Sequence, residues 1–123
     1  MNVHIIGGGN LGASIAIGIA KFTTGNQVTV TRRNTASILY LEQLGVTVSK
    51  DNKHNIQNAD IIILTIKPYQ VDTVLEEILP AIANKTIASA VSGLSIENLQ
   101  NKIGATHQAV RIMPNIASQF GAS

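Results

Sequence analysis

The chain has 123 residues, of which 45% are hydrophobic and 13% charged, and it contains no cysteine. This length suits one domain with its own core, the composition excludes a disordered chain, and the lack of cysteine excludes disulfide scaffolds and cysteine-ligated metal sites. The net charge is only +2 and aromatic residues make up 3%, so a basic, aromatic-rich surface for nucleic acid is not expected. Because no apolar run approaches the ~20 residues of a membrane helix, we expect a cytoplasmic protein that binds neither nucleic acid nor membranes.

Short β-branched apolar runs alternate along the chain with helical patterns. The runs predict strands at residues 3–6, 28–31, 46–48, 61–66, 86–91 and 109–113. The helical patterns cover residues 10–22, 35–44, 68–80 and 95–102, with a short helix or turn within 52–59. This alternation predicts an α/β fold of the Rossmann type: a doubly wound, mainly parallel sheet of about six strands with helices on both faces, in one domain over residues 1–123.

Several single residues carry local predictions. Asn10 and Ser95 are expected to cap the helices that follow them, and Gly45 to end the helix before it. Among the histidines, His4 is expected in the core, whereas His54 and His107 are expected at the surface. Asp60 is expected to be a local structural acceptor. No group of residues has the spacing of metal ligands or of a Ser/His/Asp triad.

The segment after the first strand, Gly7-Gly8-Gly9-Asn10-Leu11-Gly12, matches the pattern G-x-G-x-x-G. It follows an apolar strand and opens a helix, which is the context that dinucleotide binding requires. In that role Gly7 permits the tight turn, Gly9 lets a pyrophosphate approach the backbone, and Gly12 lets the helix pack closely on the strand. The amides at the helix start would bind the phosphates.

The end of the second strand indicates which dinucleotide is bound. NAD-specific sites place an Asp or Glu there for the ribose hydroxyl, but this chain has Arg32 and Arg33. A guanidinium can bind the 2′-phosphate of NADP in a bidentate manner, whereas a carboxylate would repel it. The pair therefore favours NADP(H), with NAD(H) as the alternative.

Three further segments carry a family resemblance. They are residues 64–68 (Leu-Thr-Ile-Lys-Pro), residues 91–96 (Val-Ser-Gly-Leu-Ser-Ile) and residues 110–115 (Val-Arg-Ile-Met-Pro-Asn). In this order and spacing, together with the glycine loop, they resemble the N-terminal domain of pyrroline-5-carboxylate reductase over the whole chain. That family reduces 1-pyrroline-5-carboxylate, a cyclic imine, to L-proline with NAD(P)H in proline biosynthesis. Ser92 stands where the family commonly has Ala, and Ile116 where Thr is common.

The resemblance implies a set of cofactor contacts. They come from Gly7, Gly9, Asn10, Leu11, Gly12, Arg32, Arg33, Asn52, Thr65, Ile66, Lys67, Pro68, Ala90, Val91 and Ser92. It also implies that Met113, Pro114 and Asn115 lie at the nicotinamide or substrate pocket. No catalytic side chain is expected on this domain, because the cofactor carries the chemistry of hydride transfer.

The resemblance further implies that a second, helical domain supplies the subunit interface and most of the substrate site. We therefore expect a cofactor-binding fragment that is inactive by itself, taken from a homo-oligomeric enzyme that acts on a small-molecule imine. Two alternatives stay open. One is a related NADP-dependent reductase, similar to 3-hydroxyacid dehydrogenases or to deazaflavin-dependent NADP reductases. The other is a non-catalytic domain that senses a dinucleotide.

Overall fold

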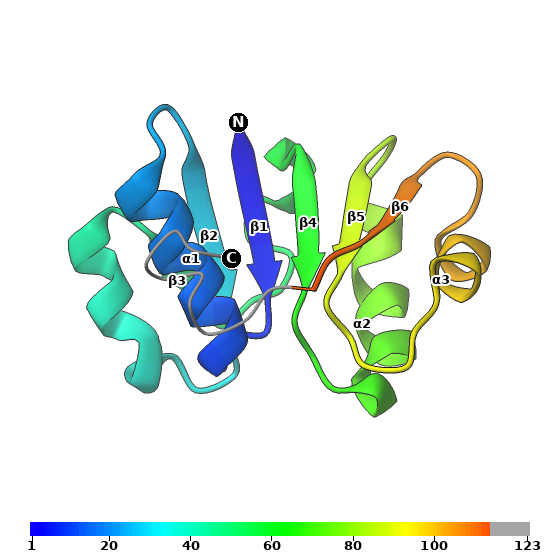
Figure 1. Ribbon diagram of the computed structural model, residues 1–123, viewed down its shortest axis with the longest axis horizontal. Coiled ribbons are helices and arrows are strands. Elements are labelled where there is room, and N and C mark those ends of the chain that lie inside the picture. The colour runs from blue at the N-terminus through cyan, green and yellow to red at the C-terminus, as the bar shows by residue number, and fades with distance from the viewer. Residues whose placement is uncertain (114–123) are drawn as a thin grey trace.

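The computed structural model describes residues 1–113, which form a sheet of six parallel strands in the order β3-β2-β1-β4-β5-β6 (Figure 1). The strands are β1 (Asn2–Ile6), β2 (Gln27–Thr31), β3 (Thr47–Ser49), β4 (Ile61–Leu64), β5 (Thr86–Ser89) and β6 (Gln108–Arg111). Three α-helices connect them, α1 (Asn10–Phe22), α2 (Val71–Ile78) and α3 (Ile96–Ile103). Four 3₁₀ helices complete the chain, η1 (Thr35–Leu44), η2 (Ile56–Asn58), η3 (Pro68–Gln70) and η4 (Leu79–Ala81). The predicted doubly wound parallel fold is confirmed.

The core lies on both faces of the sheet, because alternate residues of each strand point to opposite sides. On one face, Val3 and Ile5 of β1 pack with α1 and with Ile38 of η1. On the other face, Ile6 packs with buried residues of α2 and α3. Figure 1 accordingly shows α1 and α2 on opposite sides of the sheet. Each fully buried Ile or Leu stabilises this arrangement by about 1.5–3 kcal/mol relative to an exposed one.

One prediction about the helices needs correction. Asn10 does not cap α1, because it is the first helical residue and Gly9 occupies the N-cap position. The helix predicted at residues 35–44 is present over the same residues, as a 3₁₀ helix. Its buried residues Ile38 and Leu41 are three positions apart, and a helix with three residues per turn places both against the sheet. The other two caps are confirmed: Ser95 Oγ accepts from Asn98 N at 3.0 Å, and Gly45 adopts a left-handed φ of 84°.

The amino-terminal edge of the sheet is held by long-range polar contacts. The amide of Asn2 donates to the carboxylate of Asp60 at 2.7 Å, so Asp60 is a structural acceptor as predicted, but its partner is 58 residues away and not local in sequence. His107 is buried, with 7% of its surface exposed, so its predicted surface position is wrong. Its Nδ1 accepts from the amide of Lys85 at 3.0 Å, which satisfies the ring in the core. Among the described helices, none is long and apolar enough to cross a membrane.

Candidate functional site

The strand order reverses between β1 and β4, since β2 and β3 extend to one side of β1 and β5 and β6 to the other side of β4. In open α/β sheets, ligands bind at the carboxyl ends of the strands at such a reversal. The glycine loop follows β1 at this place, and residues 65–68 follow β4 beside it. The two loops are joined: Thr65 N donates to Ile6 O at 2.9 Å, and Thr65 Oγ1 donates to Gly7 O at 2.5 Å.

Two glycines of the loop are required by the packing of the chain itself. Gly7 has a φ of +100°, and a Cβ there would lie 2.6 Å from Thr65 O. A Cβ on Gly12 would overlap Gly7 O and lie 2.7 Å from Thr65 Oγ1. The structure therefore supports the turn role expected of Gly7 and the close-packing role expected of Gly12.

Gly9 differs from these two, because nothing in the described chain crowds it. Its φ of −73° and ψ of −165° are open to any residue, and a Cβ there would meet no atom within 4 Å. That Cβ would occupy open space beside the first turn of α1, where backbone amides lack partners in their own helix. Asn10 is exposed in this turn, and Leu11 is half-buried against the core on the α1 side. We call the open space at Gly9 and the free amides at the start of α1 the cradle. Amides at a helix start beside open space can bind a phosphate group.

The end of β2 is tied to the glycine loop. Thr31 O accepts hydrogen bonds from both Gly7 N and Gly8 N at 3.0 Å. Arg32 is half-buried, and its guanidinium donates to Gly8 O at 3.1 Å. Arg33 is exposed. Both arginines thus lie at the carboxyl edge of the sheet, but their surroundings differ.

Asn52 lies in the same region, held by three neighbours. Its side-chain oxygen accepts from Thr31 Oγ1 at 2.6 Å, and its side-chain nitrogen donates to Glu77 Oε1 at 2.8 Å. His4 Nε2 donates to the Asn52 carbonyl at 2.8 Å. His4 is 1% exposed, as predicted for a core residue, and burial lowers the pKa of its ring. Thr31 and Glu77 were not expected here, because only the tertiary structure brings them to Asn52.

The remaining expected contacts lie after β4 and β5. Thr65, Ile66 and Ala90 are half-buried, whereas Lys67, Pro68 and Ser92 are exposed. The amide of Ala90 donates to Leu64 O at 2.9 Å, which places residues 90–92 next to the loop after β4. Val91 is 2% exposed and packs in the core, so only its backbone could face a ligand.

The segment after β6 is described only in part. Met113 is 83% exposed. Pro114 and Asn115 lie outside the described residues.

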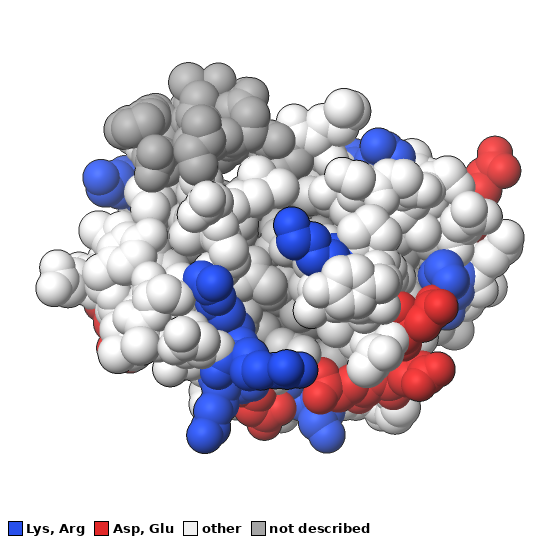
Figure 2. Space-filling model, turned by 90° about the horizontal axis from the view of Figure 1, so that it is seen from below, with Lys and Arg blue, Asp and Glu red and all other residues white. Residues whose placement is uncertain are grey.

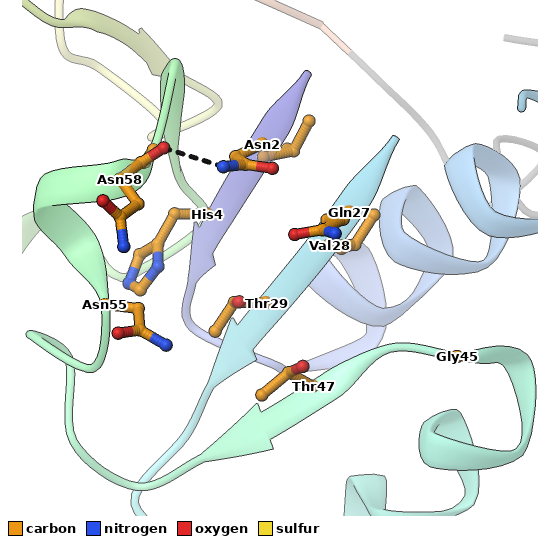
Figure 3. Close-up of a pocket in the computed structure, with 11 residues that line it drawn as sticks. Asn2, His4, Gln27, Val28, Thr29, Gly45, Thr47, Asn55 and Asn58 are labelled. Carbon is orange, nitrogen blue, oxygen red and sulfur yellow. Dashed lines mark hydrogen bonds between the residues drawn. The ribbon is translucent and has the colours of Figure 1, made fainter. Parts of the chain in front are cut away.

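An open cavity of about 480 Å³ lies at a different place, on the face of β1, β2 and β3 opposite α1 (Figure 3). Its lining includes Asn2, His4, Thr29, Thr47, Asn55 and Asn58. The figure shows the His4 ring between Asn55 and Asn58. None of the expected cofactor residues lines this cavity. Over residues 1–113 no cluster of three or more His, Cys, Asp or Glu side chains could hold a metal ion.

Comparison with known proteins gives curated relatives that are pyrroline-5-carboxylate reductases. Reductase 1 of Dictyostelium discoideum is 36% identical over 120 residues, covering 95% of this chain and 22% of that protein. The reductase of Staphylococcus saprophyticus is 34% identical, covering 100% of this chain and 47% of the relative. The chain thus spans about half, or less, of the length of these relatives.

Solved structures agree with the fold. The pyrroline-5-carboxylate reductase of Coxiella burnetii superimposes with a TM-score of 0.85 at 29% identity, over 97% of this chain and 46% of that one. The Plasmodium falciparum enzyme, solved with NADP bound, gives a TM-score of 0.82 at 24% identity, over 98% of this chain and 45% of that one. The model of the family described as "NADP oxidoreductase coenzyme F420-dependent" matches residues 2–93. This chain, with the parallel sheet and glycine loop that such a family needs, belongs to that family of NADP oxidoreductases.

Proposed function

We propose that this chain is the NADP-binding part of an oxidoreductase that reduces 1-pyrroline-5-carboxylate to L-proline with NADPH. The curated relatives bear the name of this activity, and two of them are more than 30% identical over nearly the whole chain. The relatives are at least about twice as long as the matched stretch. We therefore propose that most substrate-holding residues of the whole enzyme come from outside residues 1–123.

The observation that carries dinucleotide binding is the open space at Gly9. Gly7 and Gly12 are explained by contacts within the chain, but the backbone at Gly9 would accommodate alanine without a clash. A glycine at this position is useful when another molecule must approach the backbone closely. The adjacent amides of α1 and the two arginines after β2 supply donors and positive charge for phosphate groups.

The residues fit the parts of NADP(H) as follows. The amides of Asn10 and Leu11 would bind the pyrophosphate, and Gly9 would leave room for it. Arg32 and Arg33 lie at the edge where the 2′-phosphate would bind, and Asn52 would face the adenosine ribose.

Thr65, Ile66, Lys67, Pro68, Ala90, Val91 and Ser92 would line the path toward the nicotinamide. The bound cofactor would supply the hydride. The chain would bind and orient the cofactor and exclude water from it.

The remaining assignments follow the same proposal. The substrate is a small imine, and Met113, Pro114 and Asn115 would lie at its pocket. We propose that the whole enzyme is a cytoplasmic homo-oligomer without nucleic-acid or membrane partners. The weak excess of positive charge, +2 over 123 residues, supports only the absence of a nucleic-acid partner.

The binding test uses the wild-type chain and two variants. NADPH binding is measured by titration calorimetry, and folding by circular dichroism. We expect Gly9→Ala to lose NADPH binding while it keeps the wild-type spectrum, because its Cβ would fill the phosphate space. Lys21→Ala, in the last turn of α1 at the opposite edge of the sheet, is the control for binding. Undiminished NADPH binding by a folded Gly9→Ala variant would contradict the proposed cradle.

The activity test uses the whole protein, with NADPH oxidation followed by absorbance. We expect turnover with 1-pyrroline-5-carboxylate. The family description favours one second candidate, reduction of NADP by a reduced deazaflavin. Reduction of NADP⁺ by the reduced deazaflavin or by a 3-hydroxy acid, followed as the appearance of NADPH, together with no turnover of the imine, would replace our assignment. NADPH binding without turnover of any of these substrates would favour a sensing domain.

A further inference from the structure

Arg32 and Arg33, although adjacent in sequence, differ in what their side chains contact. Arg32 is half-buried and its guanidinium donates to the carbonyl of Gly8 at 3.1 Å. The amide of Gly8 in turn donates to Thr31 O at 3.0 Å. Gly8 is therefore held on both sides by the end of β2, and Arg32 supplies one of the two contacts. This makes Arg32 part of the structure that shapes the glycine loop.

A third cation, Lys50, lies beside the two arginines. Thr31 is paired with Ser49 in the register of β2 and β3, and Arg32 N donates to Ser49 O at 3.0 Å. Because adjacent strands lie about 4.8 Å apart, the residue that follows Ser49 comes next to Arg32 at the carboxyl edge. Figure 2, viewed toward this edge, shows Lys and Arg side chains gathered against one another.

Arg33 and Lys50 are exposed, and within residues 1–113 neither side chain makes a hydrogen bond or an ion pair. The nearest acid in sequence, Asp51, is turned into its own loop, where Oδ1 accepts from Lys53 N at 3.0 Å. The cationic groups of Arg33 and Lys50 can thus bind a phosphate without first breaking a contact within residues 1–113. Arg32 would have to share its guanidinium with Gly8.

We propose that Arg33 and Lys50 bind the 2′-phosphate of NADPH, and that Arg32 is a positioning residue that shapes the glycine loop. This inference rests on the proposed function, and it assigns Lys50 to the site as a determinant of cofactor specificity. The three basic residues Arg32, Arg33 and Lys50 then have two different roles in dinucleotide binding. Arg33 and Lys50 distinguish NADPH from NADH, whereas Arg32 serves both dinucleotides equally.

The test measures the dissociation constants of NADPH and NADH by titration calorimetry for five single variants. Lys50→Met and Arg33→Met should each weaken NADPH binding about fivefold, as expected for loss of one solvent-exposed charged contact, and leave NADH binding within about twofold. Arg32→Met should weaken both dinucleotides by the same factor. Lys21→Met, in the last turn of α1 at the opposite edge of the sheet, is the control and should change neither. Lys50→Arg, which keeps the positive charge that Lys50→Met removes, should bind NADPH as the wild type does.

Circular dichroism is used to check that each variant is folded. Unchanged NADPH affinity in Lys50→Met overturns the role of Lys50, and loss of NADPH affinity alone in Arg32→Met overturns the division of roles. Either result leaves the proposed function standing if the wild-type chain binds NADPH. A wild-type chain that binds neither dinucleotide would overturn both the function and this inference.

Discussion

Substituting Gly12 by alanine tests the close packing of α1 on the glycine loop. The new Cβ would overlap Gly7 O and lie 2.7 Å from Thr65 Oγ1, and one of the two crowded groups is backbone. Relief requires α1 to move away by about 1 Å, since an ordinary Cβ contact begins near 3.4 Å. This helix buries Ala13, Ile15, Ala16 and Ile17, and a gap of that size forfeits about a quarter to a half of their contact energy. With the strain of overpacking, the loss is about 3 kcal/mol.

Urea unfolding followed by circular dichroism measures this loss. With an m-value of about 1.5–2 kcal/mol per molar, typical of small domains, the midpoint should fall by about 1.5–2 M. Gly9→Ala is the matched control, because its Cβ meets no atom within 4 Å, and it should cost less than about 1 kcal/mol. Equal stability of the Gly12→Ala variant and the wild type would refute the packing argument, and so would equal losses in the two variants.

Three further predictions concern polar contacts of the fold. Burial lowers the pKa of His4 in the folded chain, so the unfolded chain binds the proton first as the pH falls. The contribution of His4 to the free energy of unfolding is therefore fully present above about pH 6.5, and it is lost as the pH drops toward the pKa of the folded chain. Urea unfolding between pH 8 and 5 should show a shallower fall for His4→Gln than for the wild type or for His54→Gln; identical profiles would contradict the role of His4. Thr31→Val removes the donor to Asn52 and should cost about 1 kcal/mol, whereas Thr31→Ser retains it, and equal unfolding energies would argue against the bond. Lys85 Nζ donates to the carbonyls of Gln57 and Ala59, so Lys85→Met should lower the free energy of unfolding by about 1–2 kcal/mol, and a loss no larger than that of the exposed control Lys53→Met would show the contacts to be unimportant.

The strands were predictable because their apolar, β-branched runs are bounded by turn residues, and each observed strand overlaps its predicted range. Three strands are shorter than predicted at their carboxyl ends: β4 ends at Leu64, β5 at Ser89 and β6 at Arg111. β4 ends opposite the last residue of β1, because Leu64 pairs with Ile6 and the chain after Ile6 turns into the glycine loop. There the Thr65 hydroxyl contacts the carbonyls of Ile6 and Gly7. The apolar pattern continues through Ile66, so it does not mark where β4 ends.

The site was predictable where its conformation is determined by one short stretch of sequence, as in the glycine loop. It was not predictable where partners come from distant segments. Asn52 is held by Thr31 and Glu77, which are 21 and 25 residues away. His107 is buried because the amide of Lys85, 22 residues away, binds its ring. Such contacts depend on strand order and leave no local pattern in the sequence.

The bonds between Thr31 O and the glycine loop separate the loop amides into two groups. Gly7 N and Gly8 N already have this acceptor without a ligand, whereas Asn10 N and Leu11 N open α1 and have no acceptor within the helix. In hydrogen–deuterium exchange, the first two protons should therefore be slow in the ligand-free chain, and the last two should slow only when a dinucleotide is added. The sheet thus holds the amides of Gly7 and Gly8 in place before a ligand binds. The exchange rates of the Asn10 and Leu11 amides report whether a dinucleotide is bound.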